Sequence, residues 1–297
     1  MAERRIEQRF SATAAYTCFS RACASCERDE RFRGSDDVAR TFLPLFAKAI
    51  LGVRALRSFF VRRVAPPGIY EYVLARTKLL DALFVSALDE GISQIVLLGA
   101  GMDTRAIRFR NRNRGTKVFE LDIETTQRPK VAILARKGIS LPEELVFVEI
   151  NFDREDLAGV LTAAGYRNDR RSLFLWEGVT MYLTADAVDA TLGFVRDGPE
   201  ARIVFDYVYA SVLRGEEQYY GERQIRRRVS KAGEGWTFGI EDGGIDVYLA
   251  DRGLRLVEHH TAADLEKEYL TADDGRIFGR INGTHAIAVA EAPVGGG

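Results

Sequence analysis

The sequence predicts an α/β fold with a parallel sheet, and three observations support this prediction. From residue 94 onward, short apolar runs typical of buried strands alternate with segments of helical periodicity. The first run ends in a glycine-rich turn, and the second ends in acidic residues. The first ninety residues, in contrast, have helical patterns. We therefore expect one sheet domain with a helical N-terminal cover.

The N-terminal cover is predicted to contain three helices. Residues 11–27 have the composition of a helix, and a second helix is expected over 36–51 with Asp36 as its N-cap. The Pro-Pro-Gly sequence at 66–68 is a break. After it, apolar residues at helical spacing predict a long helix over 69–90.

The remaining chain is predicted as alternating strands and helices. Apolar runs predict strands over 94–98, 117–121, 145–150, 172–176, 201–207, 254–259 and 286–290. The segments between them predict helices over 124–137, 153–164, 184–195, 245–252 and 262–269. Thr184 is the expected N-cap of the third of these helices. Such alternation is typical of a parallel sheet with both faces covered.

The alternation stops at 208–239, a polar and tyrosine-bearing segment that we predict to be a helical lid. No repeat or linker marks a domain boundary. We therefore predict a single domain over 1–297. Its parts would be the cover at 1–90, the α/β core at 91–207 and 240–291, and the lid at 208–239.

Composition excludes several classes of protein. The 297 residues include 42 Lys and Arg and 43 Asp and Glu, so the net charge of -1 gives no general reason to expect nucleic acid or a membrane surface as a partner. The chain has no apolar stretch of membrane-spanning length, and its charged N-terminus does not resemble a secretory signal. We expect a cytoplasmic protein, with its oligomeric state left open.

Three cysteines, Cys18, Cys23 and Cys26, lie in one N-terminal segment. The last two have the spacing of a zinc-binding pair, but a second pair or histidines at ligand spacing are missing. We therefore expect reduced structural thiols and no metal.

The glycine-rich turn after the first strand is the strongest functional signal. Gly99 and Gly101 allow the backbone to approach a ligand closely. Thr104 stands where a dinucleotide fingerprint needs its third glycine, so a pyrophosphate site is weakly supported. Asp122 follows Gly101 by about twenty positions, a spacing that suits a ribose-binding acid. These features suggest a nucleoside ligand without a pyrophosphate, foremost S-adenosylmethionine.

The segments QIVLLGAGMDTRAIRF, VFELD and LFLWEGVTMYLT resemble the leucine carboxyl methyltransferase superfamily of class I S-adenosylmethionine-dependent methyltransferases. The likeness is greatest to its bacterial branch, which includes polyketide carboxyl O-methyltransferases, and runs from about residue 11 to residue 290. It implies a Rossmann-like class I methyltransferase fold, with a seven-stranded, mostly parallel sheet whose last strand is antiparallel. It also implies S-adenosyl-L-methionine as cofactor.

The resemblance also implies which residues hold the cofactor. Arg76 matches an arginine that pairs with the carboxylate of the cofactor's methionine part, a task that suits a forked guanidinium. Gly99 and Gly101 match glycines that contact the cofactor, and Asp122 matches the acid that binds the ribose hydroxyls. Glu177 matches an acid near the methionine part, where it could hold the ammonium group.

Three further residues match the family less closely. Asn151 and Phe152 stand where the family commonly has an aspartate and a hydrophobic residue against the adenine. The asparagine oxygen can still accept from the adenine amino group, but without a charge. Arg21 is the nearest candidate for a second basic residue at the cofactor carboxylate.

The expected chemistry is in-line transfer of a methyl group to an oxygen of a small-molecule acceptor. A carboxylate is favoured, because it is ionised at neutral pH and needs no base, and the chain has only three histidines. The first alternative is a hydroxyl, which needs a general base that the sequence does not identify. The second is a non-catalytic cofactor-binding or RNA-associated protein. RNA association is supported only by two arginine-rich runs, at 105–114 and 226–228. Candidates to line the acceptor site are Tyr207, Tyr209, Tyr219, Tyr220 and Trp236. For each of them taken singly, packing of the lid against the sheet is the favoured alternative.

Overall fold

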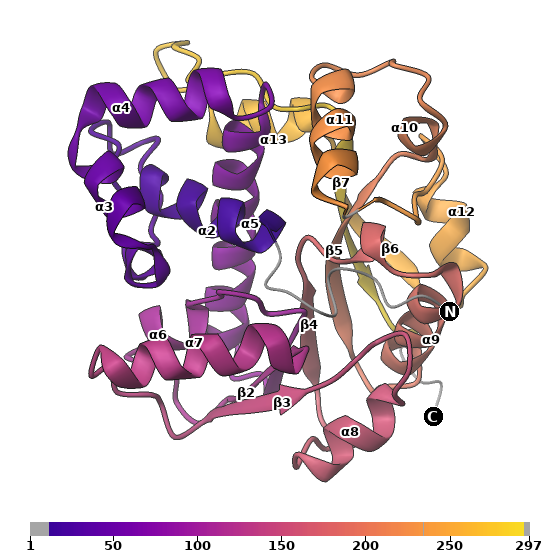
Figure 1. The fold of residues 1–297 in the computed structure, drawn as a ribbon. Coiled ribbons are helices and arrows are strands. Elements are labelled where there is room, and N and C mark those ends of the chain that lie inside the picture. The colour runs from indigo at the N-terminus through magenta and orange to yellow at the C-terminus, as the bar shows by residue number, and fades with distance from the viewer. Residues whose placement is uncertain (1–11, 234, 294–297) are drawn as a thin grey trace.

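The computed structural model describes residues 12–233 and 235–293, and a seven-stranded sheet runs through its centre (Figure 1). The strand order is β3-β2-β1-β4-β5-β7-β6. The bounds are β1 Gln94–Leu98, β2 Lys117–Asp122, β3 Leu145–Glu149, β4 Ser172–Trp176, β5 Arg202–Val208, β6 Arg255–His260 and β7 His285–Glu291. β7 runs antiparallel to β5 and β6, and the other pairs of this sheet are parallel. The predicted strands and the antiparallel last strand are confirmed.

The strand order reverses beside β1, which pairs with β2 on one side and with β4 on the other. The loops that leave β1 and β4 therefore diverge and open a crevice at the carboxyl ends of the strands. β1 and β4 are buried along their whole length, which explains their uninterrupted apolar sequences. The turn after β1 and Glu177 after β4 lie at this crevice.

Helices of the N-terminal cover pack beside the sheet (Figure 1). Their bounds are α2 Ala12–Ala24, η1 Val38–Phe42, α3 Leu45–Gly52, α4 Arg54–Phe59, η2 Phe60–Val64 and α5 Ile69–Asp89. The predicted single helix over 36–51 is wrong, because the segment is split between η1 and α3. Pro44 has no amide hydrogen and disfavours helical backbone at Leu43, whose ψ is 143°. Asp36 still acts at a helix start, since its Oδ1 accepts from Ala39 N at 2.9 Å.

The predicted helices of the α/β core are present, with bounds α7 Glu124–Arg136, α8 Leu157–Ala163, α9 Ala185–Arg196, α12 Ile245–Ala250 and α13 Ala262–Tyr269. A short helix after the glycine-rich turn, α6 Arg105–Arg108, was not predicted. Thr184 caps α9, since its side chain accepts from Ala187 N at 3.2 Å. α8 begins later than predicted, because the Asp156 side chain caps it. The long helix predicted over 69–90 is α5, and the first predicted helix is α2, with residue 11 outside the described part.

The predicted lid contains α10 Ala210–Arg214 and α11 Glu222–Ala232 in its described part. Ile225 and Val229 lie one helical turn apart on α11, and they pack with Ile69 and Val73 of α5. The second half of the lid therefore lies over the beginning of α5, at the carboxyl-end side of the sheet.

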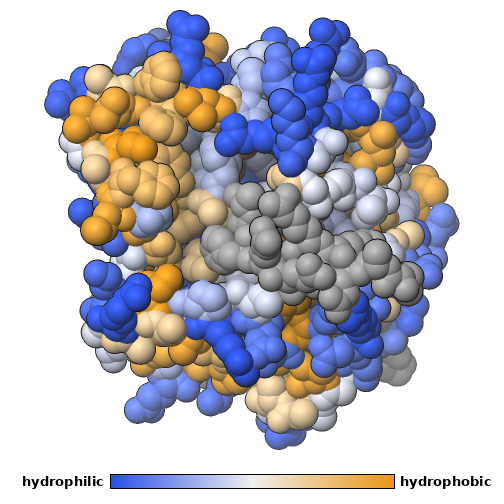
Figure 2. Space-filling model, in the orientation of Figure 1, coloured by the Kyte–Doolittle hydropathy of each residue, from blue (hydrophilic) through white to orange (hydrophobic). Residues whose placement is uncertain are grey.

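The surface of the cover is unusually apolar over α3 and α4, where Figure 2 shows a hydrophobic area in its upper left part. Leu45, Phe46 and Phe59 expose 86%, 71% and 55% of their surface. This area is separate from the crevice. Within the described ranges, no helix combines the length and the apolar character that crossing a membrane requires.

Candidate functional site

A pocket of about 310 Å³ opens in the crevice at the carboxyl ends of β1 and β4. The eight residues that the sequence predicts as cofactor ligands all line it. They are Arg21, Arg76, Gly99, Gly101, Asp122, Asn151, Phe152 and Glu177. Residues separated by up to about 150 positions in the chain are thus brought to one cavity.

The glycine turn and Asp122 form one end of the pocket. Gly99 has a φ of 68°, and a Cβ at this position would overlap Val179 Cγ2, so both the conformation and the space require glycine. Gly101 N donates to Asp122 Oδ2 at 2.6 Å, and Ile123 N donates to Oδ1 at 2.7 Å. Burial raises the pKa of Asp122 to about 6, although both amides oppose this shift. The carboxylate is thereby fixed at the turn, with lone pairs left for ligand hydroxyls.

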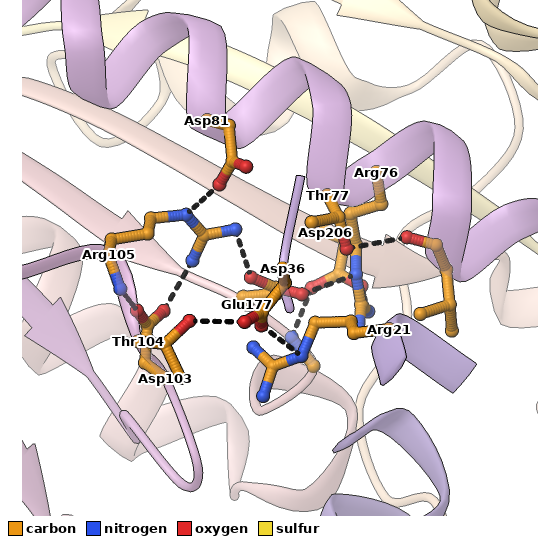
Figure 3. Close-up of polar contacts among 12 residues, drawn as sticks. Arg21, Asp36, Arg76, Thr77, Asp81, Asp103, Thr104, Arg105, Glu177 and Asp206 are labelled. Carbon is orange, nitrogen blue, oxygen red and sulfur yellow. Dashed lines mark hydrogen bonds and ion pairs between the residues drawn. The ribbon is translucent and has the colours of Figure 1, made fainter. Parts of the chain in front are cut away.

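At the end of the pocket away from Asp122, Arg76 lies between the carboxylates of Asp206 and Glu177 (Figure 3). Its Nη1 is 2.5 Å from Asp206 Oδ2, and its Nε is 3.0 Å from Glu177 Oε1. Burial alone would lower the pKa of Arg76, but the two acids outweigh it and raise the pKa. Asp206 is held in turn by Tyr72 OH at 2.9 Å and by Gly178 N at 2.6 Å. Sequence reasoning missed Asp206.

Arg105 extends this ion-pair network toward α5 (Figure 3). Its Nη2 lies 2.9 Å from Glu177 Oε2, its Nε lies 2.9 Å from Asp81 Oδ1, and its Nη1 pairs with Asp103. Arg105 is 1% exposed. Glu177 is therefore held between two guanidiniums. The sequence placed Arg105 in the glycine-turn motif, but it did not identify Asp81 or Asp103 as its partners.

Arg21 reaches the glycine turn from α2. Its Nη2 donates to Met102 O at 2.5 Å, and its Nε lies 3.3 Å from Asp36 Oδ2. Both side chains are buried. The first helix therefore supplies a cation beside the glycine turn, although part of its hydrogen-bonding capacity is used within the chain.

Asn151 and Phe152 form the wall of the pocket after β3. Asn151 Oδ1 accepts from Asp153 N at 3.1 Å, and Asn151 N donates to Glu155 Oε2 at 2.7 Å. The amide oxygen keeps a second lone pair, so it can still accept from an adenine amino group. Phe152 contributes an apolar surface beside it.

The half of the pocket below the lid is apolar. Its lining residues include Tyr16, Ile69, Val73, Tyr182, Ile225, Val229 and Trp236. Of the five aromatic candidates for the acceptor site, only Trp236 lines the pocket, and the other four pack elsewhere, which is the favoured alternative for each. Tyr207 and Tyr209 pack against each other in a separate core cluster, where Tyr219 stacks on Tyr209. Tyr220 lies under Arg280. The apolar half of the pocket, called the chamber below, could have been identified from the sequence. Its signal was the pairs of apolar residues four positions apart on α5 (Ile69, Val73) and on α11 (Ile225, Val229).

His285, at the beginning of β7, lines the same cavity and was also missed. Its ring stacks on Tyr72 with the ring centroids 4.7 Å apart and meets the Trp236 ring edge-to-face at 5.3 Å. A single histidine at the start of an apolar strand carries no motif, so the sequence offered no specific signal for it.

The donor set fits S-adenosyl-L-methionine. Glu177 Oε1 is buried and accepts no hydrogen bond from the described residues, although it is ion-paired, so it can accept from an ammonium group. The Asp122 carboxylate suits a ribose, and Gly101 beside it leaves room, since a Cβ there would have its nearest neighbour, Ala14 Cβ, at 3.9 Å. Arg21 and Arg76 provide cations, and Phe152 provides an apolar wall for a base.

Comparison with known proteins agrees with this geometry. A model of the leucine carboxyl methyltransferase family matches residues 14–196. A Mycobacterium marinum protein, assigned to the S-adenosyl-L-methionine-dependent methyltransferases, is 30% identical over 238 residues, which cover 75% of each chain. A protein of Mycobacterium sp. (strain KMS) with the same assignment is 37% identical over 163 residues, which cover 55% of this chain and 53% of that one.

Two crystal structures have a similar fold. One is assigned as a methyltransferase from Thermobifida fusca and has a TM-score of 0.59 at 15% identity, covering 96% of this chain and 95% of the other. The second, a DUF574 family protein from Streptomyces avermitilis, has a TM-score of 0.59 at 16% identity, with 97% and 100% covered. At this identity the likeness concerns the fold alone.

Proposed function

Because this chain belongs to the leucine carboxyl methyltransferase family and is an S-adenosyl-L-methionine-dependent methyltransferase, we propose that it methylates an oxygen atom of a small, largely apolar acceptor. The observation that carries the proposal is the continuity of the pocket. A polar half with the eight predicted cofactor residues opens directly into an apolar half under the lid.

The polar half would hold the cofactor by charge and by shape. The Arg76 guanidinium has five N–H donors, so it can bind a ligand carboxylate while it remains paired with Asp206. Glu177 would receive the ammonium group, and Asp122 would accept from the ribose hydroxyls. Asn151 and Phe152 would contact the adenine, and Arg21 would add positive charge near the methionine carboxylate. When bound, S-adenosyl-L-methionine supplies an electrophilic methyl group on a sulfonium sulfur.

The apolar half would hold the acceptor and exclude water. Ile225 and Val229 of the lid face Ile69 and Val73 of α5, so the chamber has hydrophobic walls on two sides. A methyl transfer depends mainly on positioning and on keeping water away from the reacting atoms. The chain can contribute both through these walls.

A carboxylate is the first candidate for the accepting oxygen, as the family resemblance implies. Arg228 lines the chamber, with its guanidinium carbon 5.6 Å from the centre of the Tyr16 ring, and could attract such an acid. A hydroxyl is the second candidate, and the presence of His285 in the same cavity favours it, because a hydroxyl needs a proton acceptor.

Association with RNA has less support than methylation of a small molecule. Arg105 and Arg108 of the first arginine-rich run are committed to Asp81 in ion pairs, and both side chains are at most 5% exposed. They are therefore not available to phosphates.

Calorimetric titration with S-adenosylhomocysteine tests the cofactor site, and absence of binding would refute the proposal. A screen with labelled S-adenosyl-L-methionine against small carboxylic acids, phenols and alcohols tests transfer. Alkaline treatment of the products then separates the two candidates, because an ester loses its label and an ether keeps it.

A further inference from the structure

His285 is a buried imidazole whose protonation state can be assigned from its neighbours. Only 6% of the residue is exposed, and burial lowers its pKa to about 4, with Asp206 opposing and Arg76 adding to this shift. The ring is therefore neutral at physiological pH and carries one proton, on either Nδ1 or Nε2. Which nitrogen carries it decides what the ring can offer to the pocket.

The first step of the assignment is the side-chain amide of Asn282. Its Nδ2 donates to Pro67 O at 2.9 Å, and its Oδ1 accepts from Thr284 N at 3.2 Å. Since a carbonyl oxygen only accepts and a backbone amide only donates, these two contacts fix which end of the Asn282 amide is oxygen.

The second step is the hydroxyl of Thr284. Its Oγ1 lies 2.5 Å from Asn282 Oδ1 and 2.8 Å from His285 Nδ1. The amide oxygen has no proton, so the proton in the shorter contact belongs to Thr284. A hydroxyl has a single proton to donate, and Thr284 Oγ1 must therefore accept from Nδ1–H of His285.

The third step follows for the other ring nitrogen. With the proton on Nδ1, Nε2 of His285 carries a bare lone pair, and the contact with Thr284 involves Nδ1 and not Nε2. The ring lines the pocket between Tyr72 and Trp236. Tyr72 also donates to Asp206, the partner of Arg76, so His285 stands beside the end of the pocket assigned to the methionine part.

We propose that His285 is the general base of this enzyme and that the methyl acceptor is therefore an apolar alcohol or a phenol. The inference rests on the proposed methyl transfer and selects the second of its two acceptor candidates. An ionised carboxylate has no proton to donate, so its oxygen and the lone pair of Nε2 would repel each other. A hydroxyl would donate to it.

The step is balanced without a further reactant. The acceptor oxygen forms a bond to the methyl carbon, and the carbon–sulfur bond breaks with its electron pair remaining on sulfur. The hydroxyl proton passes to Nε2 of His285 and afterwards to solvent. Because the oxygen becomes positively charged as the new bond forms, its proton becomes strongly acidic, so even a weakly basic imidazole can accept it.

Nitrogen-15 NMR of the imidazole rings in the full-length protein with S-adenosylhomocysteine tests the assignment without turnover. His285 is identified by the signal missing from His285→Gln. We expect Nδ1 protonated and Nε2 unprotonated, and Thr284→Val, which removes the acceptor of Nδ1–H, should shift this balance toward the other tautomer. A protonated Nε2 in the wild-type protein would overturn the proposal.

A matched acceptor panel tests the role itself, with each phenol or alcohol paired with the carboxylic acid of the same skeleton. We expect methylation of hydroxyl members only, and His285→Gln should lower kcat by about 100-fold or more while the affinity for S-adenosylhomocysteine stays within about 2-fold. His260→Gln is the control, because His260 lies on β6 and pairs with Glu258 outside the pocket. Base-labile products, or an unchanged kcat in His285→Gln, would refute the role. Failure of the wild-type protein to bind S-adenosylhomocysteine would instead refute the proposed function.

Discussion

Arg105 Nη2 lies 2.9 Å from Glu177 Oε2, and this contact joins the turn after β1 to the loop after β4. Arg105 also pairs with Asp81 on α5, so a single guanidinium connects three segments around the pocket. Glu177 is the acid that the family resemblance assigns to the cofactor's ammonium group. Its carboxylate is therefore held by Arg105 on one oxygen and by Arg76 on the other.

Replacing Arg105 should destabilise the fold. Arg105→Met leaves the buried carboxylates of Asp81, Asp103 and Glu177 without their shared cation, which we expect to cost about 3–5 kcal/mol of unfolding free energy. Urea unfolding followed by circular dichroism measures the loss. Arg110→Met, at an exposed position of the same arginine-rich run, should change stability by less than about 0.5 kcal/mol. Equal effects of the two substitutions would contradict this account of Arg105.

Arg76 should recognise only the amino-acid part of the cofactor. Arg76→Met removes a charge-assisted contact to the carboxylate, so we expect the dissociation constant for S-adenosylhomocysteine to rise by about 10- to 100-fold. 5′-Methylthioadenosine, which lacks the amino-acid part, is the control ligand, and its affinity should change by less than about 3-fold. Calorimetric titration of the same protein preparation with each ligand measures both dissociation constants. If both affinities fall together, Arg76 acts on the shape of the pocket and not on the carboxylate.

Much of the fold could be predicted from the sequence because local patterns decide it. β1 and β4 are short and fully buried, so their apolar runs mark their limits. Local patterns do not predict which charged side chains pair with each other. Asp206 meets Arg76 across 130 positions of the chain, and nothing local specifies such a pair. A single acid within the apolar sequence of β5 was nevertheless a usable signal, since a buried carboxylate needs a partner.

The aromatic side chains show the same limit. Tyr207 lies in β5 and Tyr209 lies one residue beyond its end, and period two places residues two positions apart on the same side of an extended chain. Tyr207 and Tyr209 share one face, and that face belongs to the hydrophobic core and not to the pocket. The tautomer of His285 depends on Thr284, Asn282 and Pro67 together, and only their three-dimensional arrangement reveals it.

Cofactor affinity should depend on pH through Asp122. Its pKa is raised to about 6, chiefly by burial, so the neutral form is favoured in the folded protein below that pH. The raised pKa contributes stability that is full below about pH 4 and lost as the pH rises through 6. Accepting from ribose hydroxyls uses the ionised form. The affinity for S-adenosylhomocysteine should therefore rise as the pH increases from 5 to 7, by up to about 10-fold per unit below the pKa, and then level off.

Asp122→Asn is the control for this pH profile. The amide of Asn cannot ionise. The variant should therefore bind S-adenosylhomocysteine more weakly than the wild type at pH 7, and its affinity should not increase between pH 5 and 7. Glu120, whose pKa burial raises to about 7, titrates nearby in both proteins and pairs with Lys130. A profile that keeps its slope in Asp122→Asn would assign the pH dependence to Glu120 and not to Asp122.

Gly99 and Gly91 separate backbone strain from steric overlap, because both have a φ of 68° and only Gly99 lacks room for a side chain. In Gly91→Ala, the cost comes only from placing alanine in the left-handed conformation, so the variant should lose about 1–2 kcal/mol of unfolding free energy. Gly99→Ala adds the overlap with Val179 Cγ2, for which we expect a further loss of about 1–3 kcal/mol. Urea unfolding of both variants measures the difference. Adding Val179→Ala to Gly99→Ala should recover part of that difference, because it removes the overlapping methyl groups. If the two glycine variants lose the same stability, the overlap is relieved by backbone movement, and the tight turn after β1 is less rigid than its packing indicates.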